Sequence, residues 1–416
     1  MRARAALLIV VFAALEARAD EARAERLLFV GDVLLSRQVA DEIRERGTDP
    51  WRHLRGLFAA ADWVGGNLEG AVGEPGECNP RLVAAGTCFA VPAALLARVR
   101  EAGFAALALD NNHRADLRAV GRARTRAAVA DSGLLPLTFE RSPEFVRVGS
   151  LDVAVIALDR VADVEGAIDA LPSVELARKL RLARALAQLT LVSVHWGREL
   201  VDTPDASQRA AATWLVEHGA DVVLGHHPHV VQPSECVSGR PVYFSLGNHL
   251  FDQKYPETRR GRIADCSLDG AELRCGALAT EAAPRSTTPS LVGVEEDVRA
   301  ALASCPVPLR ERLTVDGHAI RALPTPVRSE RLEVALAGGP AGAVPTRAPT
   351  SGARGGRRSW RHRPFRCRTK GTRSSCSPWR RTPRHSTGES RRAPTFTRSR
   401  PAGSPPNGVA AGSRGP

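Results

Sequence analysis

VVLGHHPHVVQ, at residues 222–232, places three histidines within four positions directly after a short apolar run. An apolar run of this length is consistent with a buried strand. Histidine is the commonest side-chain ligand of metals in proteins. The stretch therefore predicts a strand whose end presents metal ligands.

A proline within this stretch indicates which histidines face one site. Because proline disfavours helical geometry at the residue before it, we expect His227 to be extended. Alternate residues of an extended chain point the same way. His227 and His229 would then face one site together, and His226 would point elsewhere. His227 and His229 are therefore the predicted ligands.

Similar apolar runs alternate with helical patterns from residue 26 to about 250. The pattern at 92–103 begins with Pro92 and ends at Gly103, and the pattern at 205–219 offers Asp205 as an N-cap. Strand–helix alternation of this kind predicts an α/β layered fold. The apolar runs lie at 27–30, 62–64, 105–109, 153–158, 189–194, 222–224 and 242–246.

Six of these seven runs lead into carboxylate, amide or imidazole side chains. They are Asp32, Asn67, Glu69, Asn111, Asn112, His113, Asp116, His195, Glu199, the three histidines above and Asn248. Ligands of open α/β sheets bind at the carboxyl ends of strands, so we expect these groups to meet. Oxygen and nitrogen donors without thiolate suit Mn, Fe, Zn or Mg. Their number predicts one divalent ion, or two ions that share a carboxylate.

Each of these residues alone also has an ordinary structural interpretation. Asp32 alone would be a cap or turn residue, Asn111 and Asn112 a turn, and His195 a packed histidine. Glu199 and Asp116 would orient neighbours or pair with arginines. Only the combination favours a metal site. Asp159, which has no motif around it, is interpreted as structural, as are His53, His218 and His249.

Six motifs in fixed order resemble the CapA capsule-synthesis family. They are VGDVLLSR, GGNLEG, DNNHRAD, SVHWGREL, GHHPHVVQ and YFSLGNHLFDQ, within residues 26–255. The family is named for poly-γ-glutamate capsule assembly and is related to the calcineurin-like metallophosphoesterases. The resemblance implies a four-layer α/β/β/α sandwich of the metallo-dependent phosphatase type, with the site where the two sheets meet.

The resemblance also implies a role for each site residue. His113 would donate a proton to the leaving group and Asp116 would hold its other nitrogen. Glu69 would be the carboxylate shared between ions. Glu199 and Asn248 are expected to support the ligands or to contact substrate. The implied metal ligands are Asp32, Glu69, Asn112, His195, His227 and His229.

The sequence departs from the superfamily pattern at its first motif. Metallophosphoesterases usually begin with Asp-x-His, but Asp32 is followed by Val33 and Leu34. One imidazole ligand is missing, so a second ion would bind weakly or not at all. Asp110 and His249 replace a small residue and a phenylalanine that the CapA family commonly has.

The net charge of +13 is not distributed evenly along the 416 residues. Residues 341–416 contain 18 Lys and Arg and one acidic residue, while the rest of the chain has a net charge of −4. A nucleic-acid partner is therefore not expected for the folded body, and a basic nucleic-acid arm is the less favoured alternative for the tail. We expect a domain at 26–280, its extension at 281–338 and a disordered tail at 339–416.

The N-terminus predicts export, which would permit disulfides between the cysteines. Arg2 and Arg4 precede an apolar run at 5–15, and residues 17–19 read Ala-Arg-Ala, so 1–19 is typical of a signal peptide. An uncleaved membrane anchor is the alternative. In the periplasm or outside the cell disulfides are permitted. The expected pairs are Cys78–Cys88 and Cys266–Cys275, the second around a hairpin turn.

Two functions use these features. The first is an exported metal-dependent hydrolase of a phosphoester or an envelope polymer, linked to capsule biosynthesis of poly-γ-glutamate type. The second is a non-catalytic accessory protein that binds anionic polymer during capsule assembly or export. Membrane-bound capsule machinery is a possible partner in either case.

Overall fold

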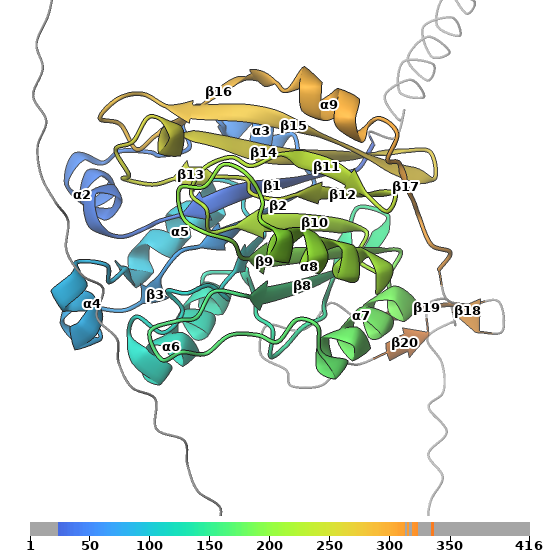
Figure 1. Ribbon diagram of the computed structural model, residues 1–416, viewed down its shortest axis with the longest axis horizontal. Helices are drawn as coiled ribbons and strands as arrows, with labels where there is room; N and C mark the ends of the chain where they lie inside the picture. The colour runs from blue at the N-terminus through green and yellow to red at the C-terminus, as the bar shows by residue number, and fades with distance from the viewer. Residues whose placement is uncertain (1–23, 313, 316–317, 323–333, 337–416) are drawn as a thin grey trace, which may run out of the picture. The chain divides into compact units, whose positions relative to one another are not determined.

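The computed structural model describes residues 24–312, 314–315, 318–322 and 334–336 (Figure 1). The first of its two large sheets has a parallel half and an antiparallel half, which meet at β1. β13 (Asn248–Leu250) pairs with the end of β1, and β17 (Val307–Pro308) pairs with β15. The strand order is β16 (Pro289–Val294), β15 (Glu272–Ala282), β14 (Arg260–Asp269), β1 (Arg26–Val33), β2 (Trp63–Leu68), β5 (Ala106–Ala108) and β6 (Leu135–Leu137).

The second sheet has four parallel strands with an antiparallel strand at each edge. Its order is β11 (Ser234–Val237), β12 (Arg240–Tyr243), β10 (Val222–His226), β9 (Leu189–His195), β8 (Leu151–Asp159) and β7 (Glu144–Val148). A small sheet of β18 (Thr314–Val315), β19 (His318–Ala322) and β20 (Val334–Leu336) follows in the chain.

Alternation of side chains along the strands produces three apolar layers. In β1, Leu28 and Val30 face one core, whereas Leu27 and Phe29 face another between the two sheets. The second sheet divides its apolar residues in the same way between that shared core and a third one. Strands buried on both faces have nearly continuous apolar sequences. This explains why short apolar runs predicted the strands correctly.

Helices cover the outer face of each sheet (Figure 1). Helices α2 (Arg37–Arg46), α3 (Arg55–Ala59), α5 (Leu96–Glu101) and α6 (Arg118–Asp131) contribute to the core outside the first sheet. Helices α7 (Val174–Leu186) and α8 (Ala206–Glu217) contribute to the core outside the second. The fold is therefore the expected four-layer α/β/β/α sandwich. Helix α8 begins at Ala206, and Asp205 is its N-cap as predicted.

Two glycines allow loops to approach strand ends closely. A Cβ atom on Gly31 would lie 1.9 Å from the Gly247 carbonyl oxygen, and one on Gly225 would lie 2.1 Å from the Phe244 carbonyl oxygen. Each of these glycines immediately precedes the last part of a strand that ends in the candidate site. Any side chain at either position would push the strand away from its neighbour.

Three disulfides form among the described residues. Cys78–Cys88 and Cys266–Cys275 are the predicted pairs, and Cys236–Cys305 was not predicted. Cys367 and Cys376 lie outside the described residues, as do the expected signal peptide and tail. Disulfides are consistent with an oxidising compartment. None of the helices in the described ranges combines the length and apolar character needed to cross a bilayer.

His249 of β13 generates a prediction about acid stability. Its Nε2 accepts a hydrogen bond from Trp51 Nε1 at 3.2 Å, and burial lowers its pKa to about 3 from the ordinary 6.5. The folded protein therefore excludes a proton that the unfolded chain binds below pH 6.5. Because of this one proton, the free energy of unfolding should fall by about 1.4 kcal/mol for each unit by which the pH decreases between about 6.5 and 3.

We expect His249→Phe to remove this one-proton contribution, so that stability declines less steeply on acidification. Urea unfolding at several pH values between 4 and 7 measures the slope for each protein. His218→Asn, at the C-terminal end of α8, is the control and should keep the wild-type slope. An unchanged slope in His249→Phe would contradict the prediction.

Candidate metal centre

The parallel strands of both sheets end at one place, and polar side chains lie there. In the first sheet Asp32, at the end of β1, is in register with Asn67 of β2 and Asn248 of β13. In the second sheet His195 and His226, the last residues of β9 and β10, are paired in register. His226 Nδ1 lies 3.4 Å from Asp32 Oδ1, which joins the two sets.

Two fully buried carboxylates, Asp32 and Glu69, form the centre of the group. The amide nitrogen of Asn67 donates to both of them, at 2.9 Å to Asp32 Oδ1 and 2.7 Å to Glu69 Oε2. Asp32 Oδ2 lies 3.2 Å from His229 Nδ1. Glu69 Oε1 lies 3.6 Å from His195 Nε2 but has no hydrogen-bond partner among the described residues. It is an unpaired acceptor in a buried site.

The other predicted ligands surround these carboxylates. His195 Nε2 lies 2.9 Å from Asn112 Oδ1 and 3.1 Å from His227 Nδ1. His229 Nδ1 also lies 2.9 Å from Asn248 Oδ1, which therefore orients that imidazole. The structure thus brings all six predicted ligands into one connected cluster.

The backbone of the histidine loop differs from the expectation. His227 has a φ of 97° and His229 a φ of 58°, so neither is extended. The preference imposed by Pro228 is overridden because Leu200 N donates to the Pro228 carbonyl at 2.9 Å and His227 N approaches Asp32 Oδ2 at 3.4 Å. The two rings still face one site, with centroids 6.0 Å apart. The two rings face one site as expected, but the extended backbone from which this was argued is not present.

The expectation that His226 points elsewhere was also wrong. Its ring is buried and faces Asp32 across the junction of the sheets. Alternation of directions applies within an extended segment, and the chain leaves that geometry immediately after His226. All three histidines of the opening stretch therefore approach the cluster.

Glu199 was expected to support the ligands or to contact substrate, but its carboxylate lies among the possible ligand atoms. There are two groups of side chains in which all the possible ligand atoms of the group lie within 4.8 Å of one another. The groups are Asp32, Glu69 and His195, and Glu199, His227 and His229. Leu34, which takes the position of the missing imidazole, is buried in the core. The second group nevertheless offers three ligand atoms because Glu199 supplies a carboxylate.

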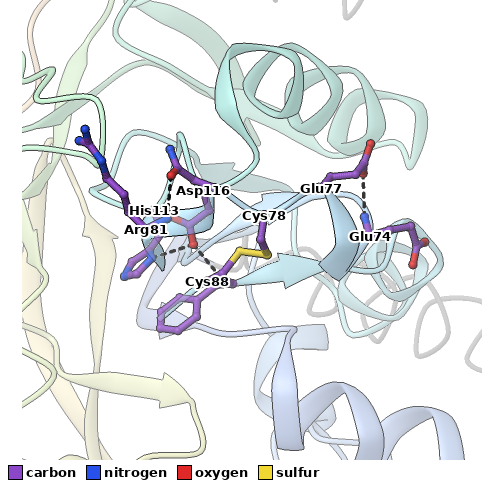
Figure 2. Close-up of a disulfide and its surroundings, with 9 residues drawn as sticks. Glu74, Glu77, Cys78, Arg81, Cys88, His113 and Asp116 are labelled. Carbon is purple, nitrogen blue, oxygen red and sulfur yellow. Dashed lines mark hydrogen bonds and ion pairs between the residues drawn. A yellow bond between two sulfur atoms is a disulfide. The ribbon is translucent and has the colours of Figure 1, made fainter. Parts of the chain in front are cut away.

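His113 and Asp116 contact one another (Figure 2), and they lie at the edge of this cluster. His113 Nδ1 lies 2.9 Å from Asp116 Oδ2, and its Nε2 lies 3.9 Å from Glu69 Oε1. The backbone N–H of His113 donates to Asn111 Oδ1 at 3.1 Å. The free nitrogen of the ring is thus directed towards the carboxylates.

The two carboxylates have opposite pKa shifts. Burial alone would raise the pKa of Asp32, but contacts with His226 and His229 outweigh it and hold that pKa well below its usual range. Burial, together with the charge of Asp32, raises the pKa of Glu69 well above its usual range. Burial and mutual repulsion thus oppose simultaneous ionisation of both carboxylates.

Two imidazoles of the cluster have lowered pKa values, and a third has a raised one. Burial, together with neighbouring imidazoles, lowers the pKa of His195 well below its usual range and that of His227 to about 3. Burial opposes protonation of His229 as well, but its contact with Asp32 outweighs burial and raises the pKa. Neutral imidazoles have the lone pair that a metal ligand needs.

Two amides have roles that the sequence did not reveal. Asn67 bridges the carboxylates, and Asn111 Nδ2 donates to Asn67 Oδ1 at 3.1 Å and to the Leu68 carbonyl at 2.7 Å. Asn111 therefore supports the bridge and is not directed at the centre. The adjacent Asn112 is the amide that faces His195. Only the position of these amides at strand ends indicated that they could contribute.

A second group of carboxylates, most of them buried, surrounds the buried Arg114. Asp159 Oδ2 lies 3.8 Å from Arg114 Nε, which is consistent with the structural interpretation of this aspartate. Arg114 also lies within 3.3 Å of Asp110, Asp163 and Asp169. Unlike the centre around Asp32 and Glu69, this group contains its own cation, the guanidinium of Arg114.

Comparison with known proteins places the chain in a family. The protein-family model described as "Bacterial capsule synthesis protein PGA_cap" matches residues 26–253. The chain is 29% identical over 260 residues to "Capsule biosynthesis protein CapA" of Bacillus anthracis, and 26% identical over 256 residues to "PGA biosynthesis protein CapA" of Bacillus subtilis (strain 168). Each alignment covers 58% of this chain, and 63% and 67% of those proteins. The chain thus spans about two thirds of the length of these relatives.

Similar solved structures include a phosphatase from Mycoplasma pneumoniae, with a TM-score of 0.38 and 11% identity over 65% of this chain and 94% of that chain. The protein TT1561 of Thermus thermophilus has a TM-score of 0.37 and 13% identity over 61% of this chain and 98% of that chain. At these values neither structure assigns a role to any residue of this chain.

The unpaired oxygen of Glu69 gives a prediction about metal binding. We expect Glu69→Gln to weaken Mn²⁺ binding, measured by titration calorimetry, by about 100-fold or more. The variant loses a charged ligand, and residues that only support ligands already contribute roughly 10- to 100-fold. Glu175→Gln, an exposed position on α7, is the control. Because the raised pKa of Glu69 favours its protonated form, Mn²⁺ must displace a proton and its affinity should rise with pH.

Proton release is counted by repeating the wild-type titration in buffers with different ionisation enthalpies. Equal Mn²⁺ affinity in Glu69→Gln and the wild type would contradict the assignment of this carboxylate.

Proposed function

Because the chain belongs to the bacterial capsule synthesis protein family PGA_cap, we propose that it is an exported metal-dependent hydrolase in the biosynthesis of an anionic envelope polymer of poly-γ-glutamate type. The names of the two Bacillus relatives support the link to capsule and PGA biosynthesis. The three disulfides support export.

The observation that most supports a metal-dependent function is the unpaired Oε1 of Glu69, which faces His195 Nε2 and His113 Nε2 in a buried site. A buried carboxylate oxygen without a partner is costly. Binding of a divalent cation would satisfy it. The chemistry supplied by such a cation is that of a Lewis acid, which polarises a substrate oxygen and lowers the pKa of water. The residues that would hold one or two ions are Asp32, Glu69, Asn112, His195, His227, His229 and Glu199.

His113 has the geometry of a proton donor. Asp116 Oδ2 accepts the Nδ1–H of His113, so a proton for transfer would come from Nε2 of the imidazolium form, and that nitrogen faces the centre. A donor at this position would protonate the leaving oxygen as the bond to it breaks. Asp116 acts through His113 because its carboxylate fixes the tautomer and the direction of the ring.

We expect His113→Asn to lower kcat by about 10²- to 10⁴-fold while Mn²⁺ affinity stays close to that of the wild type, since the residue transfers a proton and is not a ligand. The assay measures release of nitrophenol from bis(p-nitrophenyl) phosphate with and without Mn²⁺. His218→Asn, which replaces a histidine that contacts Trp214, is the matched control and should retain wild-type kcat.

Absence of turnover with Mn²⁺, Fe²⁺, Zn²⁺ or Mg²⁺ on phosphodiesters, phosphomonoesters and envelope polymer would contradict hydrolysis. Tight binding of polyglutamate in the same preparations would then favour the accessory role, in which the same side chains bind without turnover. Export is tested separately by N-terminal sequencing of the protein recovered from the periplasm or the medium. A mature N-terminus near residue 20 is the expected result.

A further inference from the structure

The segment between β3 (Ala71–Val72) and β4 (Ala90–Val91) is closed at two levels. The two short strands pair in parallel at its base. Above them the disulfide joins Cys78 to Cys88, ten residues apart, on either side of α4 (Pro80–Ala85). Figure 2 shows this disulfide beside the His113–Asp116 pair. We refer to residues 78–89 as the disulfide loop.

Both ends of the disulfide loop bind Asp116. Asn79, which follows Cys78, donates its backbone N–H to the Asp116 carbonyl at 2.8 Å. Phe89, which follows Cys88, donates its backbone N–H to Asp116 Oδ2 at 2.7 Å. That carboxylate oxygen is the one that contacts His113 Nδ1. The residue that orients the proposed proton donor is therefore held by the two residues next to the cross-linked cysteines.

Phe89 contacts the donor directly as well. Its ring is stacked on the imidazole of His113, with centroids 3.9 Å apart and an interplanar angle of 21°. The guanidinium of Arg37 lies over the same ring at 4.4 Å, and its Nε donates to Asp252 at 3.1 Å. Two groups so close to one ring must occupy opposite faces. The phenyl ring is thus held between Arg37 and His113, and it restricts the plane of the imidazole.

We propose that the Cys78–Cys88 disulfide is a positioning element for His113, acting through Asn79 and Phe89. The cross-link fixes the spacing of the two N–H groups that hold Asp116, and it fixes the ring against which His113 stacks. Its effect on catalysis rests on the proposed function, whereas its effect on the His113 ring does not. The proposal also assigns Phe89 as a positioning residue.

The chain offers a matched control. Cys266 and Cys275 are directly opposite one another in the hairpin of β14 and β15, where the backbone ladder already sets their spacing. Their disulfide closes nine residues, against ten for the disulfide loop. Removal of either disulfide opens a loop of similar length. Only the Cys78–Cys88 disulfide adjoins residues that hydrogen-bond to Asp116.

The test compares Cys78→Ala/Cys88→Ala with Cys266→Ala/Cys275→Ala. In protein labelled with ¹³C at histidine, the stacked phenyl ring shifts the His113 ring protons upfield, and His113→Asn identifies the signal. We expect the first double variant to lose much of this shift. With the aryl phosphodiester and Mn²⁺, its kcat should fall by about 10- to 100-fold, as expected for a misplaced catalytic group, with KM and Mn²⁺ affinity within about twofold. The control should retain both the shift and kcat.

Phe89→Leu provides a second route if the first double variant does not fold. It keeps the disulfide and the N–H that binds Asp116 but removes the stacked ring, so we expect a reduced kcat. Phe89→Tyr retains the stacked ring, so its kcat should be close to that of the wild type.

A His113 shift that survives loss of the Cys78–Cys88 cross-link overturns the proposal, and so does an unchanged kcat in a variant whose shift has moved. If the wild type turns over no substrate, the proposed hydrolysis fails. The comparison of chemical shifts then still decides whether the disulfide loop positions His113.

Discussion

The centre depends on placing two carboxylates, Asp32 and Glu69, side by side in a fully buried position. Within the described residues, their neighbours at ion-pair distance are imidazoles and not lysine or arginine. One amide nitrogen, from Asn67, bridges the pair. Burying charge without a partner is costly, so such an arrangement is maintained by a proton or by a cation. The opposite pKa shifts of the two carboxylates express the same constraint. The contrast with Arg114, which neutralises its own group of aspartates, shows that the chain could have supplied an internal cation and did not do so here.

The layered architecture and the location of the centre could be predicted because each depends on a local pattern. Apolar runs such as 189–194 are continuous because both faces of the strand are buried, and that continuity is visible in the sequence. Parallel strands bring their carboxyl ends to one edge, so a polar residue after each run indicates a shared site. The same reasoning could not predict the backbone at His227 and His229. Their left-handed conformations are imposed by contacts with Leu200 and Asp32, which are distant in sequence, and local preferences of the residue before proline do not include them.

Side-chain contacts across the fold were the least predictable part of the site. Asn67 and Asn111 are close to the expected ligands in sequence, but nothing in their spacing distinguishes a bridge between carboxylates from a ligand. Phe89 has no motif of its own, and its contact with His113 depends on a loop that folds back towards that histidine. The cysteine pair at 78 and 88 was predictable as a cross-link from its spacing. Its proximity to Asp116 was not, because the two segments are distant in sequence and meet only in the folded chain.

The division of ligands between the sheets couples the centre to the fold. The first sheet contributes the carboxylates of Asp32 and Glu69, and the second contributes the imidazoles of His195, His227 and His229. These sets meet only when the apolar faces between the sheets are packed together. Binding of a cation to both sets would therefore favour the packed arrangement over any state in which the sheets separate, since a ligand that binds only the folded form stabilises it. For the same reason an apolar substitution in the core between the sheets would alter the spacing of the ligands without contacting any of them. The geometry of the centre and the stability of the sandwich are thus two consequences of the same packing.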